Sequence, residues 1–127
     1  MPASYTLKTV SEFAAAHTLR NYEGPCSRMH GHNWKVEVEL TGAELDEVGM
    51  IVDFRQIKRA TREIAERLDH RYLNEIAPFD ERNPTAENIA RYFFEELQQI
   101  FSQHKNARIS AVTLWETDRA SARYSID

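Results

Sequence analysis

The sequence contains one cysteine, Cys26, among 127 residues, so the chain cannot form an internal disulfide. It has no apolar run near 18 residues, which is about the length that a membrane-spanning helix needs. Nor does it begin with a charged and then apolar signal segment. We therefore expect neither secretion nor membrane spanning, and a reducing cytoplasm is the expected compartment. Cys26 would there be available as a thiol.

Clustered positive charge is also missing. The formal net charge is -4 at pH 7, and the arginines and lysines are scattered along the chain. Because nonspecific nucleic-acid binding usually needs a concentrated basic face, this distribution argues against a nucleic-acid partner. A few of the cations could meet a phosphorylated small molecule, although for any single residue solvated surface charge is the better explanation.

No repeat, low-complexity tract or linker divides the chain. Its composition, 42% hydrophobic and 28% charged, is that of an ordinary globular protein. The length suffices for one hydrophobic core but is short for a self-contained enzyme cleft. We therefore expect a single domain over residues 1–127.

Four segments have the patterns of strands. Residues 34–40 alternate apolar and charged side chains, which is typical of a strand with one buried face. Residues 5–13 alternate less regularly. Residues 107–116 and 122–126 are predicted to be two strands joined by a short turn.

Two helices are predicted between these strands. Residues 54–68 place apolar side chains at helical spacing, and Asp53 with Gln56 resembles a capping box at their start. A second helix is expected to begin near Thr85, because Asn83 or Thr85 can cap it and Pro84 suits an initial position.

This order of elements predicts an α+β fold. Consecutive strands would pair into a four-stranded antiparallel sheet, with both helices on one face. Such a sheet has two open edges, which proteins rarely leave unprotected. Closing these edges against further copies of the chain predicts a homo-oligomer.

Three histidines could share one metal ion. His30 and His32 point to the same side if they lie in an extended segment, and Gly31 between them allows close approach. His17 could reach the same place across the hairpin. Three imidazoles with one open position are typical of catalytic zinc, whereas a single histidine is more often a plain core or surface group.

The role of Cys26 stays open on the residues alone. Cys26 and His30 have an acceptable ligand spacing, so the thiolate could close a structural zinc site. The thiol could instead lie near the metal unbound and act as a base or nucleophile. An inert buried cysteine is the third alternative.

Further polar residues are ambiguous when taken singly. Asp69 and His70 fall at the predicted end of the first helix, where the helix dipole favours a protonated imidazole suited to donating a proton. Such pairs are also common at helix ends without any function. Glu116, at a predicted strand end, is ordinary by itself.

Five motifs together, however, resemble those of the 6-pyruvoyl-tetrahydropterin synthase superfamily in order and spacing. They are Phe-x-Ala-Ala-His17, Cys26-x-x-x-His30-Gly-His32, Leu68-Asp69-His70-x-x-Leu73-Asn74, Asn83-Pro84-Thr85-x-Glu87-Asn88 and Trp115-Glu116-Thr117. The likeness extends over residues 5–124. The short gap between Cys26 and His30 is most similar to the bacterial 6-carboxy-tetrahydropterin synthase branch.

The resemblance implies a zinc enzyme. His17, His30 and His32 would hold Zn²⁺, and Cys26 would be the general base or acid at the substrate side chain. Asp69 and His70 would form the proton relay.

The resemblance also implies a pterin site in a particular assembly. Glu116 would anchor the pterin ring, because a carboxylate can accept two parallel hydrogen bonds from an amidine-like edge. Thr85 and Glu87 would help to shape the pocket. The fold would be the tunnelling fold, in which subunits join their sheets into a barrel with active sites at subunit interfaces. We expect a homo-oligomer, a hexamer built as a dimer of trimers, that acts on 7,8-dihydroneopterin triphosphate.

Overall fold

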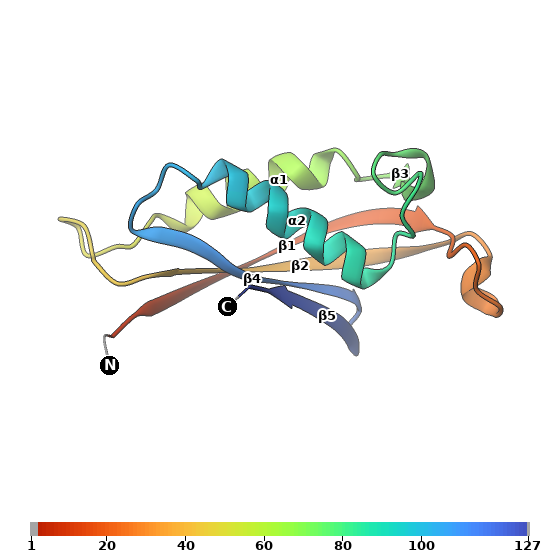
Figure 1. The fold of residues 1–127 in the computed structure, drawn as a ribbon, viewed down its shortest axis with the longest axis horizontal. Coiled ribbons are helices and arrows are strands. Elements are labelled where there is room, and N and C mark those ends of the chain that lie inside the picture. The colour runs from red at the N-terminus through yellow and green to blue at the C-terminus, as the bar shows by residue number, and fades with distance from the viewer. Residues whose placement is uncertain (1–2, 127) are drawn as a thin grey trace.

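The computed structural model describes residues 3–126 and has two layers, a twisted sheet and two helices that cover one of its faces (Figure 1). The strands lie side by side in the order β3-β1-β2-β4-β5. The strands are β1 (Tyr5–His17), β2 (His30–Gly42), β3 (Arg71–Tyr72), β4 (Ala107–Thr117) and β5 (Ala120–Ser125). The helices are α1 (Phe54–Glu66) and α2 (Ala86–Ile100), with short 3-10 turns at Pro25–Ser27 and Leu73–Glu75.

The predicted alternation of β2 is confirmed. Its even-numbered apolar side chains are fully buried beneath the helices, whereas Lys35 and Glu37 on the odd positions are only partly covered. The buried members are Trp34, Val36, Val38 and Leu40. A period of two thus fixes which face of the sheet meets the core.

Both helices begin where the sequence predicted. Asp53 caps α1, accepting from Arg55 N–H, and Gln56 reaches back to complete the capping box. Thr85 caps α2 by accepting from Asn88 N–H at 3.1 Å. The apolar stripes of the two helices then cover the sheet, and α2 contributes the fully buried Phe93 and Leu97.

The prediction of a four-stranded, wholly antiparallel sheet was wrong in one respect. The described residues form a fifth strand, the two-residue β3, which pairs parallel to β1 at Ala15 and Ala16. All other strand pairs are antiparallel, as expected. Beyond Ala15 and Ala16, β3 leaves the outer edge of β1 uncovered.

The first strand also runs four residues further than the pattern indicated. β1 ends at His17, and its pairing with β2 continues without a bulge to the pair His17↔His30. This extension carries His17 directly opposite His30. None of the helices described between residues 3 and 126 is both long and apolar enough to cross a bilayer.

Candidate metal centre

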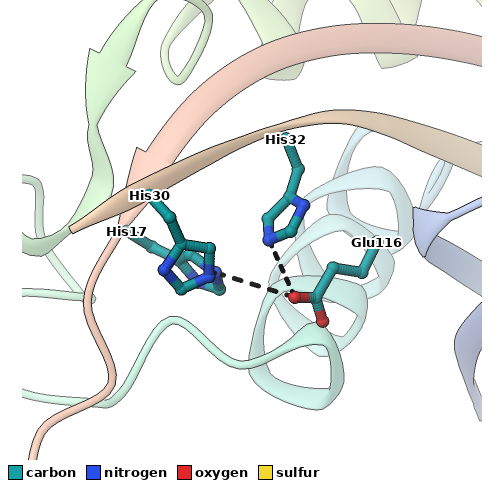
Figure 2. A group of neighbouring side chains, drawn as sticks. All are labelled: His17, His30, His32 and Glu116. Carbon is teal, nitrogen blue, oxygen red and sulfur yellow. Dashed lines mark hydrogen bonds and ion pairs between the residues drawn. The ribbon is translucent and has the colours of Figure 1, made fainter. Parts of the chain in front are cut away.

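Three strands bring four ligand-type side chains to one place under the helices. His17 is the last residue of β1 and His30 the first of β2, and the register pairs them. His32 lies two residues along β2 and so shares a face with His30. Glu116 comes from the end of β4, which pairs with β2. Figure 2 shows the four side chains directed toward a common centre.

The ligand atoms of these side chains converge closely. The Nε2 atoms of His17 and His30 are 3.0 Å apart. Glu116 Oε1 lies 2.8 Å from His32 Nε2 and 3.9 Å from His17 Nε2. One ligand atom from each of the four residues lies within 4.8 Å of all the others. A single cation could therefore contact all of them.

Backbone carbonyls fix the orientation of two of the rings. His17 Nδ1 lies 2.7 Å from the carbonyl oxygen of Pro84, and His30 Nδ1 lies 2.7 Å from that of Arg28. A carbonyl can only accept, so each Nδ1 carries the proton, and in the neutral ring each Nε2 presents a lone pair. Two lone pairs facing each other at 3.0 Å repel unless a cation lies between them. This arrangement fits a metal ion.

Burial favours the uncharged form of the His17 and His32 imidazoles. Burial lowers the pKa of His17 below its usual value, against the opposing effect of the Pro84 carbonyl. Burial likewise lowers the pKa of His32, although nearby Glu116 acts in the other direction. A neutral imidazole is the form that binds a metal, so both rings are prepared as ligands near neutral pH.

The donor set also indicates which metals suit the site. Three imidazole nitrogens with one carboxylate or open position match catalytic zinc, and imidazole also suits copper, iron or nickel. Hydrogen bonds from the outer ring nitrogens to carbonyls are the usual outer shell of such sites. The residues thus fit a divalent transition metal.

Cys26 lies outside the converging group. It is a half-buried free thiol in the 3-10 turn Pro25–Ser27, and its carbonyl accepts from Leu19 N–H at 3.0 Å. Among the described residues, the ligand atoms that come together are those of the three histidines and Glu116, without the sulfur. This arrangement gives no support to a closed zinc site with a thiolate ligand.

Asp69 and His70 contact each other at the edge of the sheet. Asp69 Oδ2 lies 3.0 Å from His70 Nδ1, and the His70 side chain is 81% exposed. Asp69 Oδ1 accepts from Ala14 N–H at 2.9 Å, and this bond, followed by the one to His70, lowers the pKa of the carboxyl. The two side chains contact each other, but they lie beside β1 outside the four-residue group, and their role as a proton relay stays a prediction.

Thr85 and Glu87 stand at the start of α2, close in sequence to Pro84, whose carbonyl holds His17. Thr85 is half-buried and uses its hydroxyl oxygen as the cap, while Glu87 is exposed in the first turn. Glu116 differs most from expectation, because its carboxylate contacts His32. The sequence gives no signal for the Glu116–His32 contact or for the Pro84 carbonyl at His17, because both join distant segments. The Arg28 carbonyl is only two residues before His30, but it belongs to an irregular stretch whose conformation has no sequence pattern.

The comparisons with known proteins agree with this architecture. Residues 6–127 match the family model described as 6-pyruvoyl tetrahydropterin synthase. A relative from Archaeoglobus fulgidus is 40% identical over 100 residues, 79% of this chain and 82% of the relative. One from Synechocystis, named 6-carboxy-5,6,7,8-tetrahydropterin synthase, is 33% identical over 88% of this chain and 86% of its own.

A solved structure shows the same fold. The 6-pyruvoyl tetrahydropterin synthase of Caenorhabditis elegans superposes with a TM-score of 0.86 and 28% identity, covering 99% of this chain and 98% of its own. The chain therefore belongs to the 6-pyruvoyl tetrahydropterin synthase family and has its tunnelling fold, as the sequence motifs predicted.

Proposed function

We propose that this chain is a zinc-dependent 6-carboxy-5,6,7,8-tetrahydropterin synthase of queuosine biosynthesis. It would convert 7,8-dihydroneopterin triphosphate into 6-carboxy-tetrahydropterin, releasing triphosphate and acetaldehyde. Relatives from Synechocystis and Bacillus subtilis carry this activity in their names at 33% and 31% identity. The observation that carries the proposal is the pair of Nε2 atoms of His17 and His30, 3.0 Å apart with their lone pairs facing.

His17, His30 and His32 would hold the metal. A bound Zn²⁺ would supply Lewis acidity at the oxygens of the substrate side chain. The carbonyls of Pro84 and Arg28 keep two of the rings in the tautomer that this requires. Uptake of the metal releases no proton from a ring that is already neutral, so burial of His17 and His32 favours loading.

The proton transfers would belong to Cys26 and His70. Cys26, as thiolate, would remove a proton from the substrate side chain, and His70 would return one. Asp69 Oδ2, 3.0 Å from His70 Nδ1, supports this role because it fixes the ring and stabilises its protonated form. No redox cofactor is needed, since the side chain of the substrate supplies the reducing equivalents.

The pterin ring would bind to Glu116, with Thr85 and Glu87 shaping the pocket from the start of α2. The half-exposed Glu116 carboxylate lies beside His32, so a ring anchored there would place its side chain toward the histidines. On binding, the carboxylate would exchange its contact with His32 for two hydrogen bonds to the pterin edge.

The assembly would be a homo-oligomer, expected to be a hexamer of two trimers. In the described residues β5 has no partner strand on its outer side, and β1 has an outer partner strand only at Ala15 and Ala16, where β3 pairs with it. His70 projects into solvent beside this same open edge of β1, which supports its acting in a neighbouring subunit's site.

The direct test is to incubate the purified, zinc-loaded protein with 7,8-dihydroneopterin triphosphate and to identify the products by mass spectrometry. We expect 6-carboxy-tetrahydropterin and acetaldehyde, and a Cys26→Ala variant should form neither at a comparable rate. Absence of any pterin product from the wild-type chain would refute the proposal.

A second candidate follows from the structural likeness to the Caenorhabditis elegans enzyme, which is named for a pyruvoyl product. The two activities would share the same site and differ in the fate of the intermediate. Formation of 6-pyruvoyl-tetrahydropterin without acetaldehyde would identify this alternative in the same experiment.

A further inference from the structure

The chain leaves the sheet immediately after His17, yet the backbone groups of the next three residues are hydrogen-bonded like those of a paired strand. Thr18 N–H donates to Asn74 Oδ1 at 2.9 Å, and Asn74 Nδ2 donates to the Thr18 carbonyl at 2.8 Å. One side-chain amide therefore satisfies both backbone groups of Thr18. Tyr72 adds a hydrogen bond from its hydroxyl to Thr18 Oγ1 at 2.8 Å.

The same arrangement is repeated two residues later. Arg20 N–H donates to Asn83 Oδ1 at 2.8 Å, and Asn83 Nδ2 donates to the Arg20 carbonyl at 2.8 Å. Asn83 is itself held by Asn88, whose side-chain amide donates to the Asn83 carbonyl at 2.9 Å. Both asparagines come from the segment between α1 and α2, at the end of the sheet where the β1–β2 connection projects (Figure 1).

The intervening residue connects this segment to the thiol. Leu19 N–H donates to the carbonyl of Cys26 at 3.0 Å. Thr18 and Arg20 thus bond to asparagine side chains while Leu19 bonds to Cys26, which is the alternation of a strand with a partner on each side. Asn74 and Asn83 replace a partner strand on one side, and the backbone of Cys26 lies on the other.

We propose that Asn74 and Asn83 are positioning residues that set the place of the Cys26 thiol relative to the histidine cluster. The inference rests on the proposed function, in which Cys26 moves a proton. Displacing a reacting group by about 1 Å can cost on the order of a hundredfold in rate. The turn Pro25–Ser27 has no buried residue, and besides the bonds within the turn its backbone is joined to residues 18–20 by Leu19 N–H.

The asparagine side chain suits this role because its primary amide offers an acceptor and a donor side by side on one short planar group. Aspartate keeps the acceptor for a backbone N–H but has no donor for the carbonyl. Asn83→Asp should therefore show part of the defect of Asn83→Ala, which removes both bonds.

The chain supplies a matched control at the other end of the sheet. Asn106 Oδ1 accepts from Glu44 N–H at 3.0 Å, and its side-chain nitrogen donates to the Glu44 carbonyl. The Asn106 amide thus bonds to both backbone groups of one loop residue, as Asn74 and Asn83 do. It lies near Gly42 and Ala107, at the end of the sheet opposite His30 and Glu116. Asn106→Ala should cost stability without affecting Cys26.

The experiment compares Asn74→Ala, Asn83→Ala, Asn83→Asp and Asn106→Ala in the zinc-loaded, full-length protein. We expect the first two to lower kcat by about tenfold to a hundredfold, with zinc content unchanged and KM within about twofold. Cys26 is the single thiol of the chain, so its alkylation by iodoacetamide reports on the loop directly. The alkylation rate of Cys26 and the hydrogen-exchange rate of the Leu19 amide should both rise in Asn74→Ala and Asn83→Ala. Neither rate should rise in Asn106→Ala.

The proposal is overturned if Asn74→Ala and Asn83→Ala match Asn106→Ala in kcat, alkylation and exchange after similar losses in Tm. A purely structural role would lower Tm alone. If the wild-type chain forms no pterin product, the proposed function fails, while the alkylation and exchange rates still confirm or overturn the positioning role.

Discussion

The orientation of single ring nitrogens determines what the histidine cluster can do. His17 and His30 each donate through Nδ1 to a carbonyl, so both present Nε2 to the centre. In the other tautomer either ring would carry its proton on Nε2 and direct it at the metal position. The sequence predicted that the three histidines meet, because His-x-His in a strand shares a face, but not that Glu116 lies with them. It could not predict the carbonyls of Pro84 and Arg28, which come from irregular segments.

The first prediction at this scale concerns metal retention. His30→Ala should lose zinc, because two ligands seldom retain the ion. Zinc content measured by mass spectrometry should fall from about one per chain in the wild type to a small fraction of that. His104→Ala, an exposed histidine beside Phe101, is the control and should keep its metal. Equal zinc in both variants would exclude His30 as a ligand.

The second prediction at the residue scale concerns Glu116. Glu116→Gln should weaken pterin binding by about tenfold or more, because the amide cannot accept two parallel hydrogen bonds. Zinc content should change little. Affinity is best measured by calorimetry with a non-reactive pterin. Unchanged affinity would remove Glu116 from the pterin site, and loss of zinc would make it a metal ligand instead.

At the scale of elements, local chemistry made the helices predictable. Asp53 and Gln56 form the capping box that their spacing indicated, and α1 ends at Glu66, two residues before the predicted end. The sequence did not predict β3, because a strand of two residues, Arg71 and Tyr72, is too short to show a periodic pattern. Next to β3, His70 N–H donates a hydrogen bond to the Ala14 carbonyl, and the His70 backbone has a positive φ of 58°. Neither feature can be predicted from the amino-acid composition.

The cap of α1 also gives a prediction for pH. The pKa of Asp53 is lowered, chiefly by its hydrogen bond from the Arg55 side chain and then by Arg55 N–H. A lowered folded-state pKa means that the ionised cap stabilises the fold above the unfolded pKa of about 3.9, and that this contribution is lost as the pH falls through the folded value.

The contribution of the ionised Asp53 cap is tested by urea unfolding of the wild type and of Asp53→Asn at several pH values. The stability difference between them should be constant near neutrality and shrink steadily below about pH 4. Asparagine remains a capping residue, so helix formation is retained in the variant. A difference that stays the same down to the most acidic conditions would contradict the assigned role of the charge.

At the scale of the whole molecule, the proposed association of subunits depends on the open edges of the sheet. Ala14 N–H and its carbonyl point outward to Asp69 and His70, so the even-numbered residues of β1 direct their backbone groups to the outer edge. The pairing with β2 runs without a bulge, so Val10 shares this orientation. Sequence reasoning predicted such edges from the order of strands, but not which backbone groups they expose.

Proline substitution separates assembly from folding. Val10→Pro removes an outward N–H and should leave the subunit folded but unable to associate along β1, giving smaller species in sedimentation velocity. Ser11→Pro removes an N–H directed at β2 and should instead unfold the sheet. A Val10→Pro protein that sediments like the wild type would show that this edge lies outside the interface.

The central claim, that three imidazoles hold one zinc ion while the Cys26 sulfur stays unbound, is tested most directly by X-ray absorption at the zinc edge of the resting protein. The account predicts only nitrogen and oxygen neighbours at about 2.0–2.2 Å, with the multiple-scattering features of several imidazoles. A sulfur neighbour at about 2.3 Å, or a spectrum without imidazole features, would contradict it.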